Sequence, residues 1–153
     1  MSLFKIFDVS GSAMSAQSVR LNTTASNMAN ANSVSSSADE TYRARSPVFA
    51  TMLQQNMEAY HSGKAGRPSA TNGQESAGVQ VLGILESQKP LNIEYSPNHP
   101  MADADGYIYR PNVNPMEEMA NMISASRSYQ TNVQVADTAK TMVARLLRLG
   151  SGN

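Results

Sequence analysis

The residues best suited to bind a metal ion are His61, His99, Asp103 and Asp105, because imidazole nitrogens and carboxylate oxygens are common metal ligands. The two histidines are far apart in the sequence, and each lies among residues that are typical of turns. The run that begins at Asp103 resembles the start of a calcium-binding loop, but its twelfth position holds Asn114 in place of the bidentate Glu. We therefore expect a hairpin turn at Asp103 and no metal site.

The side chains that catalysis needs are sparse. Glu86 and Glu94 are the only pair of carboxylates that we can assign to acid–base cleavage of a polysaccharide such as peptidoglycan. Neither histidine fits a Ser-His-Asp set, and no glycine-rich phosphate loop follows a predicted strand. The chain contains no cysteine, which excludes disulfides and thiolate metal sites. These observations predict a protein with no catalytic residues, no cofactor and no small-molecule substrate.

Composition limits both the core and the partners. The 12 basic and 12 acidic residues leave no net charge, so we expect no nucleic-acid partner. Hydrophobic residues make up 41% of the chain but aromatic residues only 6%, and tryptophan is absent, which argues against a large self-sufficient core. The apolar N-terminal stretch stops at Val9, too short for a secretory signal or a membrane span, so no cleaved signal peptide is expected.

The first segment, from Ser2 to about Asn32, contains no proline and can form one helix. Positions four and three residues apart alternate along it, which is the seven-residue spacing of a supercoiling helical seam. Ser10, Gln17 and Thr24 place polar groups in this seam. We therefore expect the helix to be loosely ordered alone and to become ordered when neighbouring molecules cover it.

The last segment predicts a second helix, from Pro115 to Leu149. Asn114 is a capping residue, proline occupies the first helical position, and Glu117 follows three residues after the cap. A seam spaced by three and four residues runs from Met119 to Leu147, and Gly150 is the expected terminator. The helix would be about 50 Å long, more than a small globule needs.

The segment between the helices has a different composition. Residues 33–39 are rich in serine and predict a linker, while 51–59 fit either a short amphipathic helix or an extended stretch. Residues 79–85 predict a strand, and 92–95 and 107–110 predict two short strands around a turn-rich piece. The sequence thus predicts a mainly α fold with a small β-containing middle domain. Its long N- and C-terminal helices pair in a coiled-coil-like terminal domain, with the chain termini close together.

Four stretches of sequence carry a family resemblance. Residues 10–17 (SGSAMSAQ) and 25–33 (ASNMANANS) resemble the N-terminal motif of the rod, hook and hook-associated axial proteins of the bacterial flagellum. Residues 112–119 (NVNPMEEM) and 124–132 (SASRSYQTN) are similar to the C-terminal motif of the rod proteins in that family. The resemblance identifies the chain as a member of the rod and hook axial family and implies a structural subunit of the proximal rod.

The resemblance also implies how such a subunit acts. Subunits of this family pack by their terminal helices into a hollow periplasmic rod around an export channel, and they leave the cytoplasm through the flagellar type III apparatus with an intact N-terminus. The implied partners are other rod subunits, further copies of the chain and the export apparatus. Residues 1–32 and 114–153 would be the two helices of a terminal assembly domain, and 33–113 a linker and small β-rich middle domain with a flexible loop at 61–78.

The expected assembly interface combines the two helical seams with polar residues of the two motifs. Asparagines in the N-terminal motif fit helix termination and an inter-subunit contact equally well. The candidate residues are Leu3, Phe7, Met14, Leu21, Asn27, Met28, Asn30, Asn32, Met119, Met122, Arg127, Tyr129, Asn132, Val133, Ala136, Val143 and Leu147.

Three alternatives stay open from the sequence. The first is another rod or hook component. The second is a secreted enzyme that cuts peptidoglycan with Glu86 and Glu94. The third is a helical adaptor or chaperone for export substrates, which would form a discrete soluble oligomer. Inertness toward cell-wall polymer and the formation of mixed polymers with axial subunits distinguish a structural subunit from the enzyme and from the adaptor.

Overall fold

The structure is a computed structural model that describes residues 3–53 and 76–150. In chain order its elements are α1 (Leu3–Asn30), β1 (Arg45–Leu53), β2 (Ser76–Glu86), β3 (Asn92–Tyr95), β4 (Tyr107–Arg110) and α3 (Pro115–Gly150). The expectation of two long terminal helices around a small β-containing middle region is confirmed. No helix in these ranges is both long enough and apolar enough to span a lipid bilayer.

Local capping contacts mark the start of α3 and the end of α1. At the start of α3, the Asn114 side-chain oxygen accepts the amide of Met116 at 3.1 Å, and Glu117 and Glu118 lie in the first turn, where acidic groups stabilise the helix dipole. α1 passes through Gly11 unbroken and ends at Asn30, whose carbonyl accepts both the amide and the hydroxyl of Ser33. The helix start predicted at Pro115 is therefore confirmed, and α3 ends at Gly150 rather than Leu149.

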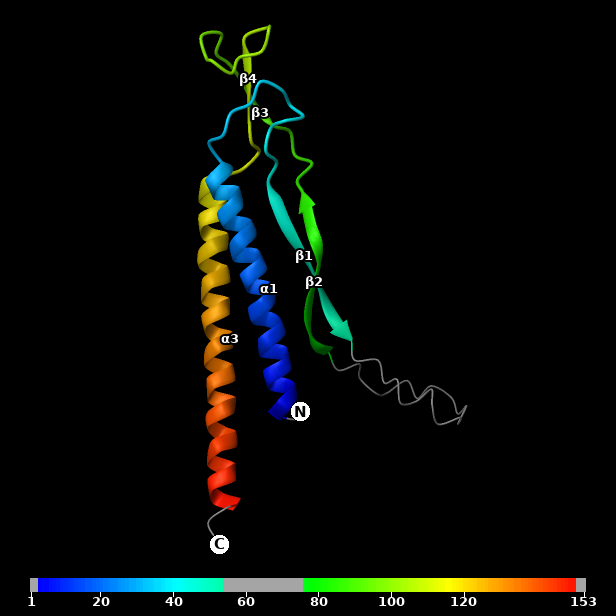
Figure 1. Ribbon diagram of the computed structural model, residues 1–153, viewed down its shortest axis with the longest axis vertical. Helices are drawn as coiled ribbons and strands as arrows, with labels where there is room; N and C mark the ends of the chain where they lie inside the picture. The colour runs from blue at the N-terminus through cyan, green and yellow to red at the C-terminus, as the bar shows by residue number, and fades with distance from the viewer. Residues whose placement is uncertain (1–2, 54–75, 151–153) are drawn as a thin grey trace, which may run out of the picture.

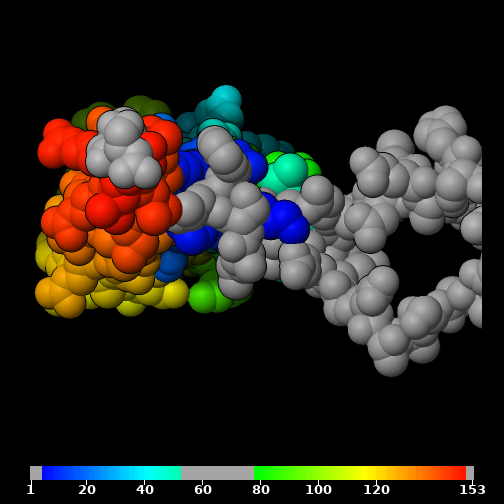
Figure 2. Space-filling model, turned by 90° about the horizontal axis from the view of Figure 1, so that it is seen from below, coloured from blue at the N-terminus to red at the C-terminus, as the bar shows by residue number. Residues whose placement is uncertain are grey.

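The helices run antiparallel and form one side of an elongated molecule (Figure 1). α1 packs against α3 along one face and against β1 and β2 along another, whereas α3 does not pack against either strand in the described ranges. Figure 2, seen from below, shows α1 between α3 and the strands. The order of layers is therefore helix, helix and two-stranded ribbon.

β1 and β2 pair antiparallel, and we call this pair the ribbon. Residues 79–85 were predicted as a strand, and β2 contains them, but it begins at Ser76, inside the segment expected as a loop. β1 covers the start of the 51–59 stretch and extends back to Arg45, where no strand was predicted. Residues 54–75, including His61 and most of the predicted loop, lie outside the described residues.

β3 and β4 form a small hairpin with the bounds that the sequence predicted. The Tyr95 and Tyr107 rings meet edge to face, with centroids 5.2 Å apart. Ser35, in the predicted linker, exchanges two 3.0 Å backbone hydrogen bonds with Tyr109, so the linker is held against the hairpin. Ile108 and Val113 are buried here.

Candidate assembly interface

Small and polar side chains make the contact between the two terminal helices. The residues buried on α1 and α3 include Ser10, Ala16 and Thr24 of α1 and Ala125 and Ala139 of α3. Small side chains let helix backbones approach closely but contribute little apolar area. Arg20 adds a 2.9 Å hydrogen bond from its guanidinium to the Asn121 side-chain oxygen on α3. The pair is therefore well fitted but holds no large apolar core.

Asn27 connects the end of α1 to the start of the ribbon. The side chain is 1% exposed, its amide nitrogen donates to the Arg45 carbonyl at 2.8 Å, and its oxygen accepts the Arg45 amide at 2.9 Å and the Tyr42 hydroxyl at 2.8 Å. Ser26 lies 3.2 Å from the same hydroxyl. Because these bonds use both the nitrogen and the oxygen of a buried amide, Asn27 acts inside the subunit, and we call this set the Asn27 clamp.

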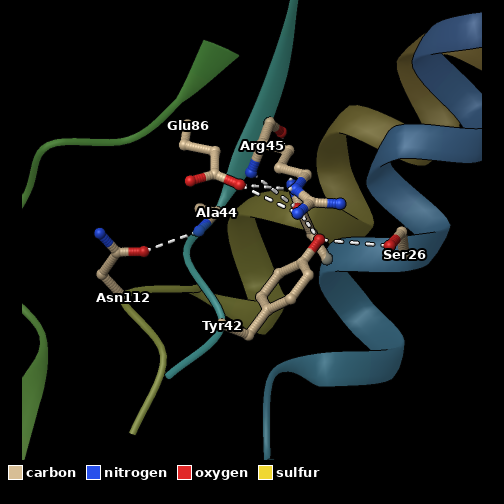
Figure 3. Close-up of polar contacts among 7 residues, drawn as sticks. Ser26, Tyr42, Ala44, Arg45, Glu86 and Asn112 are labelled. Carbon is tan, nitrogen blue, oxygen red and sulfur yellow. Dashed lines mark hydrogen bonds and ion pairs between the residues drawn. The ribbon is translucent and has the colours of Figure 1, made fainter. Parts of the chain in front are cut away.

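Arg45 links the clamp to the far strand of the ribbon (Figure 3). Its guanidinium lies 2.9 Å from the Glu86 carboxylate on β2 and stacks over the Tyr42 ring, 5.4 Å from the ring centroid. Both charged side chains are about half exposed, so the ion pair contributes little to stability, on the order of 0.5 kcal/mol. It fixes the strand register, because Arg45 and Glu86 are directly opposite each other.

Asn112 ties the segment before β1 to the segment after β2. Its side-chain oxygen accepts the amide of Ala44 at 2.8 Å, and its nitrogen donates to the Lys89 carbonyl at 2.8 Å (Figure 3 shows the first bond). Asn112 stands just before α3, so one side chain connects the ribbon to the entrance of the C-terminal helix. The two asparagines together hold the ribbon at the same end of both helices.

The other half of the ribbon rests on α1 at Ser12. The Ser12 hydroxyl donates to the Val9 carbonyl at 2.9 Å and accepts the amide of Val79 at 3.1 Å. Gly78 lies directly against this hydroxyl with a φ of 141°, a conformation that residues with a Cβ rarely adopt. The contact therefore requires glycine at this position.

Replacing Gly78 with Ala should loosen the ribbon. The new methyl group would collide with the Ser12 hydroxyl and strain the backbone, at a cost of about 1–3 kcal/mol. Hydrogen exchange at the Val79 amide should become at least tenfold faster. The control is Gly83→Ala on the same strand, where a Cβ meets no atom within 4 Å. Equal exchange rates in the two variants would contradict the assigned contact.

Most candidate residues on α1 are half-buried, at the border between the solvent-exposed surface and the face that packs within the subunit. Phe7, Met14, Leu21 and Met28 are half-buried, and Leu3 is the first residue of the helix. Asn30 donates to the Ser26 carbonyl of its own helix, while Asn32 is exposed. Of the three candidate asparagines in the N-terminal motif, Asn27 alone is buried within the subunit.

The candidate residues on α3 fall into two groups, because the helix turns Ala125 and Ala139 toward α1. Half-buried positions beside these alanines are Met122, Asn132, Ala136 and Val143, and Asn132 donates to the Ser128 carbonyl of its own helix. Exposed positions are Met119, Arg127, Tyr129, Val133 and Leu147, with Val133 42% exposed and Leu147 69%. The exposed group is available to contacts outside the subunit.

Sequence reasoning missed a second set of apolar residues on the same helix pair. Ile6 of α1 and Val135, Ala139 and Met142 of α3 line an open apolar groove between the two helices. Met142, Leu146 and Leu149 continue the apolar surface toward the end of α3. The signal was present as a second three-and-four spacing, but a seam that starts at Met119 does not include it.

Asp103 and His99, two of the residues considered for metal binding, make structural contacts within their turn. Asp103 closes the β3–β4 turn by accepting the amides of Asp105 and Tyr107, and His99 accepts the amide of Met101 through Nδ1. Among residues 3–53 and 76–150, no group of three or more His, Cys, Asp or Glu side chains is arranged to hold a metal ion. The turn predicted at Asp103 is confirmed, with Gly106 in the left-handed region at a φ of 82°.

Tyr109, which lies near this turn, has a shifted pKa. Burial, and then the neighbouring Asp103 carboxylate, raises the pKa of the Tyr109 phenol, which stays protonated and faces Asp103 Oδ2 at 3.4 Å. Glu94 pairs with Arg110 at 3.0 Å on this hairpin, while Glu86 pairs with Arg45 on the ribbon. Each of the two carboxylates weighed for polysaccharide cleavage is therefore held by its own arginine.

Comparison with known proteins gives two family matches. Residues 7–35 match the family described as "Flagella basal body rod protein", and residues 104–149 match "Flagellar basal body rod FlgEFG protein C-terminal". The flagellar basal-body rod protein FlgC of Salmonella typhimurium is 44% identical over 150 residues, which cover 98% of this chain and 99% of that protein. FlgC of Yersinia enterocolitica is 45% identical over the same shares, and FlgC of Bacillus subtilis is 34% identical over 158 residues, again 98% and 99%.

Proposed function

The chain belongs to the FlgC family of flagellar basal-body rod proteins, and we propose that it polymerises through its terminal helices into a hollow rod that surrounds an export channel. It is a structural subunit of the flagellar rod and not an enzyme. The function of the subunit is therefore to pack its helices against neighbouring subunits. The rod acts as the drive shaft of the flagellum in motility.

The observation that carries the proposal is the apolar surface that the helix pair leaves in solvent. Val133, Met142 and Leu147 are 42%, 55% and 69% exposed, although α1 and α3 are already packed together. Met142 continues the open apolar groove at Val135 and Ala139, and contiguous exposed apolar surface of this kind is typical of an interaction site. Neighbouring subunits that cover these side chains would remove them from water, at about 25 cal/mol for each Å² buried.

The terminal assembly domain proposed here consists of residues 1–32 and 114–153, with 33–113 as the middle domain. α1 and α3 would pair in a coiled-coil-like manner within it and would gain order when neighbours cover their seams. The small alanine contacts support this, because they fit the helices together without a large apolar core. The candidate interface residues on both helices are proposed to act at this stage, with Asn27 acting indirectly by holding the ribbon.

The rod would span the periplasm, and its partners would be other rod subunits, copies of the same chain and the flagellar type III export apparatus. We propose that the N-terminus is not cleaved. Ser10 is 3% exposed and Ser12 anchors β2, so the N-terminal part of α1 belongs to the folded subunit. The zero net charge supports the absence of a nucleic-acid partner.

The test is to supply this chain to cells of a flagellated bacterium that have lost swimming through deletion of their own FlgC. We expect restored swimming and the chain in purified basal bodies at its full length, because assembly requires both terminal helices. Cells without the chain give the baseline. Recovery of the chain only as a soluble oligomer, with no rod and no swimming, would contradict the proposal.

A further inference from the structure

The ribbon exposes apolar side chains on both of its faces. Ile84 and Leu85 are consecutive in β2 and so point to opposite faces, yet they are 51% and 64% exposed. Leu82 is also 64% exposed, and Phe49 and Met52 of β1 are 38% and 41% exposed. Met52 and Leu85 share a face with Gly78, whose Cβ position points toward Ser12 of α1. Phe49, Leu82 and Ile84 lie on the other face, and we call these three residues the ribbon band. Residues 46–52 and 78–85, which contain the band, include no charged side chain.

A two-stranded ribbon needs another layer to bury its apolar side chains. Within the subunit, α1 supplies that layer for one face only, through Ser12 and the Asn27 clamp. α3 does not pack against either strand in the described ranges. No other described element covers the ribbon band, which is therefore available to a contact outside the subunit.

A matching surface lies on the opposite side of the molecule. Met116, Met119 and Ile123 of α3 are 73%, 47% and 50% exposed, and their spacing of three and four places them on one helix face. Ala125, which is 0% exposed, follows Ile123 by two residues and so lies on nearly the opposite face. We call these three residues the helix band. Residues 119–126 include no charged side chain.

The two bands cannot meet within one subunit, because α1 lies between α3 and the ribbon (Figures 1 and 2). We propose that the ribbon band of one copy packs against the helix band of a second copy. The ribbon would then have a helix on each face, α1 of its own subunit and α3 of its neighbour. The inference rests on the proposed function, since it needs neighbouring copies within an assembly.

The contact uses the face of the ribbon that α1 leaves uncovered, and not the edge of β1. Pro47 has no amide hydrogen to donate to an added strand, and the ladder is irregular between Val48 and Phe49 and again between Met52 and Leu53. Both features hinder pairing of a further strand along β1. Because the two bands are different surfaces, each copy keeps one band free after the contact forms. Such head-to-tail contacts build an open chain of subunits, as a rod requires.

The chain has no cysteine, so introduced cysteines can test the contact directly. Leu82→Cys and Ile123→Cys would be placed in separate copies of the chain and expressed together in cells that build rods. Mild oxidation should give a disulfide-linked dimer that joins positions 82 and 123. The control uses Thr141→Cys in place of Ile123→Cys. Thr141 is exposed on the same face of α3, about 27 Å farther along the helix. We expect at least tenfold less product with the control.

A second cysteine position in the helix band tests whether the result depends on Ile123 alone. Met119→Cys paired with Leu82→Cys should also give the dimer, since Met119 belongs to the same band. Rods that contain these variants but yield no 82–123 or 82–119 product would overturn the contact and leave the proposed function intact. A product that joins two copies of position 82, or equal product with Thr141→Cys, would also overturn it. Failure of the unaltered chain to enter rods would overturn the proposed function and the contact together.

Discussion

Replacing Asn27 with Asp is expected to release the ribbon from α1 and to destabilise the isolated subunit by on the order of 3 kcal/mol at neutral pH. The oxygen that replaces the amide nitrogen would face the Arg45 carbonyl, which now accepts a hydrogen bond from that nitrogen at 2.8 Å. Two acceptors would then oppose each other, and the new charge would lie where the side chain is 1% exposed. Urea unfolding followed by circular dichroism measures the loss.

The pH dependence of stability in Asn27→Asp distinguishes the two reasons for its destabilisation, which are the opposed acceptors and the buried charge. Burial should raise the pKa of the introduced carboxyl, so its charged form is disfavoured in the folded state. The penalty is present above that pKa and should shrink as the pH falls through it, because the protonated acid can donate to the Arg45 carbonyl again. Asn30→Ala is the control, since the Asn30 side chain donates to the Ser26 carbonyl of its own helix, and its loss should change stability by a few tenths of a kcal/mol. Equal stabilities of the two variants would show that the clamp does not hold the ribbon.

Local signals in the sequence were sufficient for most of the elements. The cap at Asn114 and the proline after it determine where α3 begins, and both act through neighbouring backbone groups. The turn at Asp103 is equally local, because its carboxylate bonds to amides two and four residues later. The short strands on either side of it follow from that turn.

β1 was not predicted, because its stability depends on residues distant in sequence. Pro47 argues against a strand when it is read alone, and the alternation from Arg45 to Leu53 is weak. The strand forms because β2 pairs with it and because Asn27 holds both backbone groups of Arg45. Neither partner can be inferred from the residues next to β1.

Periodicity predicted the three-and-four spacing of the seam on α3, but it did not predict which face of the helix packs against α1. The predicted seam from Met119 to Leu147 is displaced by one position from the face that holds Ala125 and Ala139. Both faces have the same three-and-four spacing, and alanine carries too little apolar area to mark the packed one. As a result Met119, Tyr129 and Val133 are exposed in the subunit, where they are available to neighbours.

The account's central claim is that exposed side chains of the terminal helices build the rod, and Val133→Asp tests it most directly. Val133 is 42% exposed, so the isolated subunit should accept the charge with a change in stability within about 0.5 kcal/mol. In an assembled rod the same charge would lie unpaired in a packed contact and cost several kcal/mol. Assembly should therefore fail although the subunit folds.

The measurement is swimming and the yield of purified rods in cells whose only FlgC is the Val133→Asp variant. Ser124→Asp introduces the same charge at an exposed polar position of α3 and should leave both unchanged, and Arg127→Ala should be mild if that exposed charge is only solvated. The account predicts full-length Val133→Asp protein with normal urea unfolding, no recovered rods and no swimming. Normal rods and swimming in that strain would contradict it.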